Sequence, residues 1–366
     1  MARLKVFQVV ECGGPGGTGA QVAALCRSLD PDRFETTLVY NVRPGNLPAD
    51  YEALARPAAA VRVREMTREI HPALDLAALR ALTKLFAERR PDVVHAHSSK
   101  AGVLARLAAK AAKVPKVFYS PRGYGFLMED RPASSRALYK WMERAASRIG
   151  VVAAVSGGEA ELARSEAWAP RVEVVSDAYL GTLPESAEPR AHEGVVLTAS
   201  GRLTAARNPE AFARLAKALS KARPQVRCVW VGDGELKSSF EAVAVGAKRI
   251  ELTGWLSPDE VAARLATSDV FVHFSRWEGL PNAVLEAMAH GLPVLASDVT
   301  GNRDLVLPEL TGLLAQDEDA LFVAAKRLID DAPLRRRLGR AGRALVEREY
   351  TLPRLVRRLS ALYSGA

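Results

Sequence analysis

Short runs of β-branched and apolar residues alternate along the chain with Ala-, Leu- and Arg-rich stretches of helical period. A first set of candidate strands comprises residues 4–10, 35–40, 61–64, 92–97, 116–120 and 150–156. A second set comprises residues 195–200, 226–232, 249–254, 270–274 and 293–297. Strands that alternate with helices in this way predict two parallel sheets, each covered by helices on both faces.

A polar, proline-containing stretch at 183–192 (LPESAEPRAH) separates the two sets, and we interpret it as a linker. We therefore expect two α/β, doubly wound, Rossmann-like domains, an N-terminal one over 1–185 and a C-terminal one over 186–345. We expect residues 346–366 to form a C-terminal helix that packs back towards the N-terminal domain.

The composition is that of a globular protein, with 48% hydrophobic and 25% charged residues. We expect no transmembrane helix, since no long uninterrupted apolar run occurs. The chain starts without the apolar core of a signal peptide, and three scattered cysteines are too few for a disulfide framework, which favours the cytoplasm. The net charge of +9 suits an anionic partner, such as membrane lipid, a phosphorylated substrate or nucleic acid, and equally a general bias towards arginine.

A glycine-rich turn, ECGGPGGTG at 11–19, lies between the first strand and the first helix. Glycine lets a ligand approach the backbone, and the start of the following helix offers free N–H groups to an anion. The spacing differs from the GxGxxG of a dinucleotide site, and an ordinary turn between a strand and a helix explains it equally well.

The second domain opens with a similar element, GRLTAARNPE at 201–210, after a strand. Arg202 and Arg207 flank a loop that leads into a helix, with Asn208 as the expected N-cap. Two cations beside the positive end of a helix suit a diphosphate, although two solvated arginines in a loop would have the same pattern.

The most informative segment is 275–306, which begins SRWEGLPNAVLEAMAHGLPV. Glu278 lies in the loop after a strand, and Glu286 lies inside the helix that starts near Pro281. Both carboxylates can then face the carboxyl ends of the strands, where open α/β sheets bind ligands. Carboxylates accept strong hydrogen bonds from the hydroxyl groups of a sugar or a ribose.

This segment resembles the E-x7-E signature of glycosyltransferase family four, whose members are retaining enzymes of GT-B fold. Further segments resemble the bacterial surface-polysaccharide enzymes of that family: GRL at 201–203, VGDGE at 231–235, HAHSSKAGVLARLAA at 95–109, YSPRGYGFLMED at 119–130 and AVSGGEAELA at 154–163. The resemblance implies two Rossmann-like domains that face a cleft. It also implies transfer of a sugar from a nucleotide-sugar, with a UDP-sugar favoured, to a glycan or lipid-linked acceptor.

The resemblance assigns roles to individual residues. Glu278 would be catalytic beside the donor sugar, together with Arg202 and Arg207 on the donor diphosphate, and Glu286 would hold the ribose hydroxyls. The other donor-binding residues would be Gly16, Gly17, Gly232, Gly279, Leu280, Pro281 and Asn282. The acceptor side would include His97, Lys100 and Arg122. No cofactor or metal is implied, because basic residues and helix dipoles would neutralise the leaving diphosphate.

Two positions depart from the family's pattern. Arg207 stands where the family usually has lysine, so a planar fork replaces a point charge. Arg122, followed by Gly123, stands where the family usually has a histidine close to the donor sugar. An arginine cannot act as a base, but it can contact a sugar hydroxyl or the leaving phosphate.

His95 and His97 belong to one candidate strand, and we expect only one of them to face the cleft. No third ligand accompanies them at useful spacing, which argues against a metal site. The other histidine would then serve packing alone.

For the reaction we expect retention by front-face attack, with both arginines stabilising the leaving diphosphate, because no carboxylate can be assigned as the nucleophile of a double displacement. The alternatives are a nucleotide-sugar hydrolase or epimerase of GT-B fold, and a catalytically impaired nucleotide-sugar-binding protein, which Arg122 prompts. A nucleic-acid-binding protein is not expected, since no aromatic stacking platform or recognition helix occurs.

Residues 134–150 bear on where the protein works. The cations of this segment recur every four residues, at Arg136, Lys140, Arg144 and Arg148. Apolar residues that include Leu138 and Trp141 cover the adjoining face. The pattern is typical of a helix at an anionic membrane surface, so peripheral attachment to the inner face of the cell membrane stays open. The alternative is that the apolar face packs on the first sheet.

Overall fold

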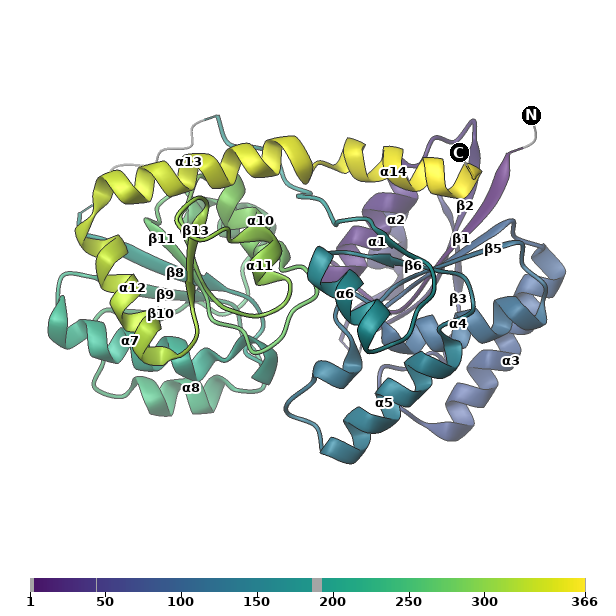
Figure 1. Cartoon of the computed structure of the whole chain (residues 1–366), viewed down its shortest axis with the longest axis horizontal. Coiled ribbons are helices and arrows are strands. Elements are labelled where there is room, and N and C mark those ends of the chain that lie inside the picture. The colour runs from purple at the N-terminus through teal and green to yellow at the C-terminus, as the bar shows by residue number, and fades with distance from the viewer. Residues whose placement is uncertain (1–2, 44, 186–192, 366) are drawn as a thin grey trace. The chain divides into compact units, whose positions relative to one another are not determined.

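The computed structural model describes residues 3–43, 45–185 and 193–365. The chain forms two compact units, one of Met1–Leu180 with Leu352–Ala366 and one of Gly181–Thr351 (Figure 1). Residues 186–192, which make up most of the expected linker, lie outside the described residues. In the part of the chain that is described, no helix is long and apolar enough to cross a bilayer.

The first unit contains a sheet of seven parallel strands in the order β3-β2-β1-β4-β5-β6-β7. The strands are β1 (Leu4–Gly13), β2 (Phe34–Val42), β3 (Ala59–Arg62), β4 (Val93–His97), β5 (Lys116–Ser120), β6 (Val151–Ala154) and β7 (Val172–Val174). The helices are α1 (Gly17–Ser28), α2 (Pro48–Ala55), α3 (Pro72–Arg89), α4 (Ser99–Ala111), α5 (Ala133–Ala146), α6 (Gly157–Ser165) and α14 (Leu352–Ser364). The strand order reverses at β1, as in other doubly wound sheets.

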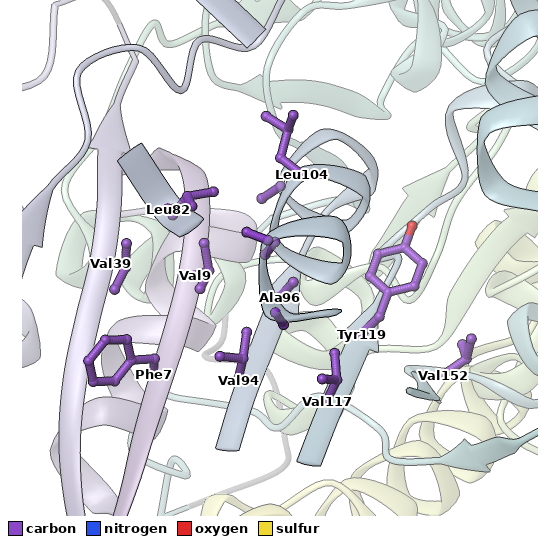
Figure 2. Close-up of a cluster of buried hydrophobic side chains, with 14 of the residues drawn as sticks. Phe7, Val9, Val39, Leu82, Val94, Ala96, Leu104, Val117, Tyr119 and Val152 are labelled. Atoms are coloured by element: carbon purple, nitrogen blue, oxygen red, sulfur yellow. The ribbon is translucent and has the colours of Figure 1, made fainter. Parts of the chain in front are cut away.

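Helices pack against both faces of this sheet. Because successive residues of a strand point to opposite faces, most residues of the central strands are buried. One face packs against α3 and α4, where Val9 belongs to the same buried cluster as Leu82 and Leu104 (Figure 2). The other face packs against α1 and α14, where Val6 and Leu359 are buried together. The C-terminal helix is therefore part of the core of the first unit.

The second unit contains a sheet of six parallel strands in the order β10-β9-β8-β11-β12-β13. The strands are β8 (Val196–Ser200), β9 (Arg227–Val231), β10 (Ile250–Leu252), β11 (Val270–His273), β12 (Val294–Ser297) and β13 (Gly312–Ala315). The helices are α7 (Pro209–Ala222), α8 (Lys237–Ala244), α9 (Pro258–Leu265), α10 (Asn282–Ala289), α11 (Asn302–Leu305), α12 (Glu318–Asp330) and α13 (Ala332–Glu349).

The expectation of two parallel α/β sheets is confirmed, and every candidate strand overlaps an observed one. The strands β7 and β13 were not predicted. They have three and four residues and lie at the edges of their sheets, and such short segments carry too few residues for a period-two pattern to stand out.

Candidate functional site

The order of the second sheet reverses between β8 and β11, its two central strands. Loops that leave two such strands at their carboxyl ends diverge, and ligands of open α/β sheets bind between them. Arg207 follows β8 and Glu278 follows β11. Nη1 of Arg207 forms an ion pair with Oε1 of Glu278, so the fold brings together two of the three predicted catalytic residues.

A third residue, His273 at the end of β11, belongs to the same group. Its Nε2 lies 2.9 Å from Oε1 of Glu278 and 2.9 Å from Nη1 of Arg207. We call Arg207, His273 and Glu278 the Arg–His–Glu cluster. Sequence reasoning missed His273, although one signal was present: it is the polar last residue of an apolar strand, VFVH, and such a residue lies at the carboxyl edge of the sheet.

The charges of this cluster follow from its burial. The side chain of Glu278 is only 10% exposed, and burial by itself raises the pKa of a carboxyl group. The charge of Arg207 and the hydrogen bonds from His273 and Ser275 outweigh that effect and hold the pKa of Glu278 below its usual value. Burial lowers the pKa of His273. At neutral pH the cluster therefore contains a carboxylate, a neutral imidazole and a guanidinium.

Hydrogen bonds tie the loop after β11 to its surroundings. The amide of Arg276 donates to the carbonyl of Ala206 at 2.8 Å, which joins this loop to the one after β8. The buried amide Nδ2 of Asn302 donates to the carbonyl of Ser297 at 2.9 Å and lies 3.4 Å from Oγ of Ser275. A site held in this way loses little conformational freedom when a ligand binds.

The turn after β9 lies against the turn after β8. Gly232 has a φ of 137°, and a Cβ built on it would lie 2.2 Å from the carbonyl oxygen of Gly201. Only glycine permits this approach. The indole Nε1 of Trp230 donates to the same oxygen at 3.0 Å. A small cavity beside these turns is lined by Ala199, Ser200, Arg207, Asn208, Phe212, Trp230, Val272, His273 and Phe274.

Arg202, the third predicted catalytic residue, has a different partner. Its Nε lies 3.1 Å from Oε2 of Glu235, and the two side chains are 45% and 56% exposed. Arg202 is not among the residues that line the cavity beside Arg207. Its contact with a diphosphate stays a prediction.

The other predicted residues of this region surround the start of α10. Gly279, Leu280 and Pro281 are buried, and Asn282 begins the helix. Glu286 follows one turn later. Burial raises the pKa of Glu286 to about 7, and the charge of Arg207 acts in the opposite direction. Within the described part of the chain no hydrogen bond to this carboxyl group lowers its pKa.

In the first unit, Gly16 is the N-cap of α1 and Gly17 is its first residue. Both are exposed, and apart from their own neighbours in the chain no atom of the described residues lies within 4 Å of the position that a Cβ would take at either glycine. Backbone groups at this helix start are therefore open to a ligand. Contact of the two glycines with a donor stays a prediction.

His97 and Arg122 lie together at the carboxyl ends of β4 and β5. Nε of Arg122 donates to Nδ1 of His97 at 3.3 Å, and Nη1 of Arg122 forms an ion pair with Asp177. The side chains of Arg122 and Asp177 are each 6% exposed. Arg122 has a φ of 55°, an uncommon conformation for a residue with a side chain, and such strain concentrates at functional sites. Sequence reasoning missed Asp177.

The expectation that only one of His95 and His97 faces the cleft side of the strand was wrong. The two ring centroids lie 4.1 Å apart, and both side chains are buried on one face of the sheet. Residues two positions apart on a strand share a face, since the side-chain period is two. His95 binds Tyr363 and Ser120, whereas His97 is the one that contacts Arg122.

Lys100, at the start of α4, is bound within its own unit. Its Nζ lies 2.5 Å from Oδ1 of Asp75 and 3.3 Å from Oγ1 of Thr67, and its side chain is 9% exposed. A role on the acceptor side would require Lys100 to release some of these partners, and it stays a prediction. Within the described ranges, no group of three or more His, Cys, Asp or Glu side chains is arranged to hold a metal.

Two family models match the chain. Residues 16–178 match the glycosyl transferase 4-like domain, and residues 194–331 match the glycosyl transferases group 1. The chain is 33% identical over 293 residues to the UDP-Gal:alpha-D-GlcNAc-diphosphoundecaprenol alpha-1,3-galactosyltransferase of Escherichia coli, which covers 74% of this chain and 75% of that one.

Two solved structures resemble the whole chain. A sucrose-phosphate synthase from Thermosynechococcus elongatus has a TM-score of 0.79 at 18% identity and covers 99% of both chains. The Anabaena protein HepE, in complex with UDP and glucose, has a TM-score of 0.77 at 17% identity and covers 100% of both chains. Similarity at this level of identity concerns the fold, and these two neighbours share the GT-B architecture.

Proposed function

We propose that this chain, which belongs to the family-four glycosyltransferases, transfers a sugar from a nucleotide-sugar to a glycan or lipid-linked acceptor in the synthesis of a cell-surface polysaccharide. The observation that carries the proposal is the Arg–His–Glu cluster at the point where the second sheet reverses its strand order. A UDP-sugar is the proposed donor, because the name of the E. coli relative specifies UDP-Gal and HepE was crystallised with UDP. The diphosphoundecaprenol in the same relative's name supports a lipid-linked acceptor.

Arg207 is the proposed partner of the donor diphosphate. A guanidinium has five N–H donors, so Arg207 can bind phosphate oxygens while Nη1 stays at Glu278. The hydrogen bonds of Glu278 keep it ionised and oriented, and a carboxylate in that state can accept a hydrogen bond from a sugar hydroxyl. Glu286, whose burial no hydrogen bond from the described residues offsets, is the proposed acceptor for the ribose hydroxyls.

Arg202 is the proposed second cation for the diphosphate. Its pair with Glu235 is exposed on both sides, and exposed ion pairs contribute about 0–1 kcal/mol. Arg202 therefore loses little free energy when it leaves Glu235 and pairs with a doubly charged phosphate instead. The two arginines together supply the positive charge that we propose replaces a metal ion at the leaving group.

Retention at the anomeric carbon is proposed to proceed by front-face attack. A double displacement requires a carboxylate nucleophile, and the charge of Arg207 and the hydrogen bond from His273 to Oε1 weaken Glu278 in that role. In the proposed route, the bond between the anomeric carbon and the phosphate oxygen breaks while the acceptor oxygen bonds to the same face. The leaving phosphate oxygen takes the acceptor proton. Isolation of a covalent glycosyl-enzyme would exclude this route.

The test of the function is transfer itself. Purified protein is screened by thermal shift against UDP-, GDP-, CMP- and dTDP-sugars, since a ligand at about 100 times its Kd stabilises by roughly 2.7 kcal/mol. The donor found is then incubated with a lipid-diphosphate-linked sugar, with a metal chelator present, and the product linkage is determined by NMR. We expect acceptor-dependent transfer with retained configuration. Consumption of the donor without acceptor would indicate a hydrolase or epimerase, and binding without turnover would indicate an impaired enzyme.

We propose that the protein attaches to an anionic membrane through α5. The exposed apolar side chains of this helix, rather than its row of basic residues, would make the contact. Lys140 forms an ion pair with Glu166, and the guanidinium carbon of Arg144 lies 3.8 Å from the ring centroid of Trp168. These two cations are thus held within the unit. The apolar residues Leu138 and Trp141 are the exposed ones, at 48% and 65%. Insertion of these two side chains at the membrane interface therefore supports attachment better than the basic stripe does.

Sedimentation with anionic vesicles tests the attachment. Trp141→Ala should reduce the fraction bound at low salt. Trp255→Ala is the matched control, because Trp255 is 64% exposed but lies in the second unit. Neither substitution removes a charge, so a loss confined to Trp141→Ala identifies apolar insertion. Equal binding by both variants would argue against docking through α5.

A further inference from the structure

A chain of buried hydrogen bonds leads from Arg122 to the C-terminal helix. Nε of Arg122 lies 3.3 Å from Nδ1 of His97, and Nε2 of His97 lies 2.8 Å from Oε1 of Gln8 on β1. Nε2 of Gln8 then lies 3.0 Å from the hydroxyl of Tyr363 on α14. Tyr363 is 355 positions from Gln8 in sequence, and both side chains are fully buried.

The series of hydrogen bonds continues from Tyr363 across the sheet. The Tyr363 hydroxyl lies 2.6 Å from Nδ1 of His95, and Nε2 of His95 lies 2.9 Å from Oγ of Ser120. Ser120 donates to the carbonyl of Ala153 at 2.7 Å. Gln8 and His95 are paired in register, so these side chains project from adjacent strands onto the face that α14 covers.

The two groups at the ends of this series of hydrogen bonds, the Arg122 guanidinium and the Ala153 carbonyl, determine the direction of every bond in it. A guanidinium can only donate, so Nδ1 of His97 is unprotonated and its Nε2–H donates to Gln8. The amide of Gln8 donates to Tyr363, so the Tyr363 hydroxyl donates to His95. His95 then carries its proton on Nε2 and donates to Ser120, which donates to a carbonyl that can only accept. Burial lowers the pKa of His95 to about 3 and also lowers that of His97, so both rings are neutral.

We propose that Tyr363 is a positioning residue for the transfer reaction, which acts through Gln8 and His97 to hold Arg122 in its strained conformation. Of the groups along this path, the Tyr363 hydroxyl is the one that both accepts from Gln8 and donates to His95. Without it, the Gln8 amide loses this acceptor, and the direction of the bonds to His95 is no longer determined. The inference rests on the proposed acceptor-side role of Arg122.

Tyr363 is held rigidly enough for such a task. Its ring packs 5.3 Å from that of Phe118 and 6.2 Å from that of Phe34. Nζ of Lys116 donates to the backbone carbonyl of Tyr363 at 2.7 Å. The hydroxyl is thus fixed against β1 and β4, and a small displacement of α14 is transmitted to His97.

The experiment compares Tyr363→Phe with Tyr119→Phe. Tyr119 is equally buried in the same unit and donates to Glu143 at 2.6 Å, but it lies outside the chain of bonds. Tyr363→Phe should lower kcat/KM for the acceptor by roughly tenfold to a hundredfold, as misplacement of a substrate-positioning group does, with no change in Kd for the nucleoside diphosphate. Tyr119→Phe should change neither constant. Gln8→Met cuts the same chain from β1, and the double variant should lose no more kcat/KM than either single one.

A second readout is independent of activity. In ¹⁵N-histidine-labelled wild-type protein, NMR should find both His95 and His97 as neutral Nε2–H tautomers. The His95 tautomer should no longer be uniform in Tyr363→Phe. Protonation of His97 at Nδ1 in the wild type, or equal kcat/KM for Tyr363→Phe and Tyr119→Phe, would overturn the inference. Wild-type protein that has the expected tautomers but transfers no sugar would instead contradict the proposed function.

Discussion

The guanidinium of Arg207 and the carboxylate of Glu278 form an ion pair across 71 positions of sequence, and His273 lies 2.9 Å from both. The pair exists because β8 and β11 are neighbours in the sheet although two strands separate them in sequence. The pair keeps the buried Glu278 carboxyl group ionised. Because it uses Nη1 of Arg207, the other N–H groups of the guanidinium can bind a ligand.

Arg207→Ala should weaken UDP binding by roughly tenfold to a hundredfold. It removes charge-assisted hydrogen bonds worth about 1.5–3 kcal/mol where water is excluded. Titration calorimetry with UDP measures the effect. Arg214→Ala is the matched control, because Arg214 pairs with Glu318 in the same unit and not with a residue of the cluster. Unchanged affinity in Arg207→Ala would remove this residue from the donor site.

Arg202→Ala should also reduce the affinity for UDP while it leaves the melting temperature nearly unchanged. The exposed pair with Glu235 contributes little to stability, so its loss has no large effect on folding. Calorimetry and thermal unfolding on the same sample distinguish the two quantities. If Arg202→Ala binds UDP as tightly as wild type, Arg202 does not contact the donor, and its ion pair with Glu235 is only structural.

Glu278→Ala should lower kcat more than it raises the donor KM, and Glu286→Ala should raise the donor KM. An interaction made mainly in the transition state appears in kcat, whereas uniform binding appears in KM. Steady-state kinetics with varied donor concentration tests both variants. Near-wild-type constants in both would refute the assignment of the two carboxylates.

UDP binding near pH 6.5 should release a proton from Glu286. Burial raises its pKa to about 7 in the free protein, and ribose hydroxyls that donate to the carboxylate would pull the pKa down again. Affinity should therefore rise as the pH rises through about 7. Calorimetry in buffers of different ionisation enthalpy counts the protons. The UDP phosphate titrates near the same pH, so Glu286→Gln, which loses only the contribution of the protein, is the reference.

The raised pKa of Glu286 affects stability in the opposite direction to UDP affinity: stability falls as the pH rises. A carboxyl whose folded-state pKa is raised stabilises the fold below its unfolded pKa, and that contribution is lost as the pH rises through about 7. Glu286→Gln should therefore raise the melting temperature of the ligand-free protein at pH 8 relative to wild type. At acidic pH the two proteins should melt alike.

Gly232→Ala should lower the free energy of unfolding by more than Gly246→Ala does. Both glycines have positive φ, at 137° and 82°, so both substitutions incur backbone strain of about 1–3 kcal/mol. Only at Gly232 would the added Cβ also collide with a carbonyl oxygen, that of Gly201 at 2.2 Å. Urea unfolding of the two variants measures the difference. Equal losses would mean that the turns after β8 and β9 separate easily.

Local patterns in the sequence were sufficient for the sheets and for the segment around Glu278 and Glu286. Strand and helix periods, a proline near the start of a helix and the spacing of two acids are properties of neighbouring residues, and each can be recognised without knowledge of the rest of the chain. The resemblance to the family rests on the same segment and on five further ones, and the family models and the E. coli relative establish membership. The error over His95 and His97 was also local, since the strand period assigns both to one face.

Only the tertiary structure decided which partners the functional side chains have. Arg122 meets Asp177 55 positions away, Tyr363 meets His95 268 positions away, and His273 meets Arg207 66 positions away. Strand order, register and the return of α14 to the first sheet set these contacts. The physical reason is that burial makes a polar group depend on whichever donor or acceptor the fold brings within about 3 Å, and no local pattern records that distance.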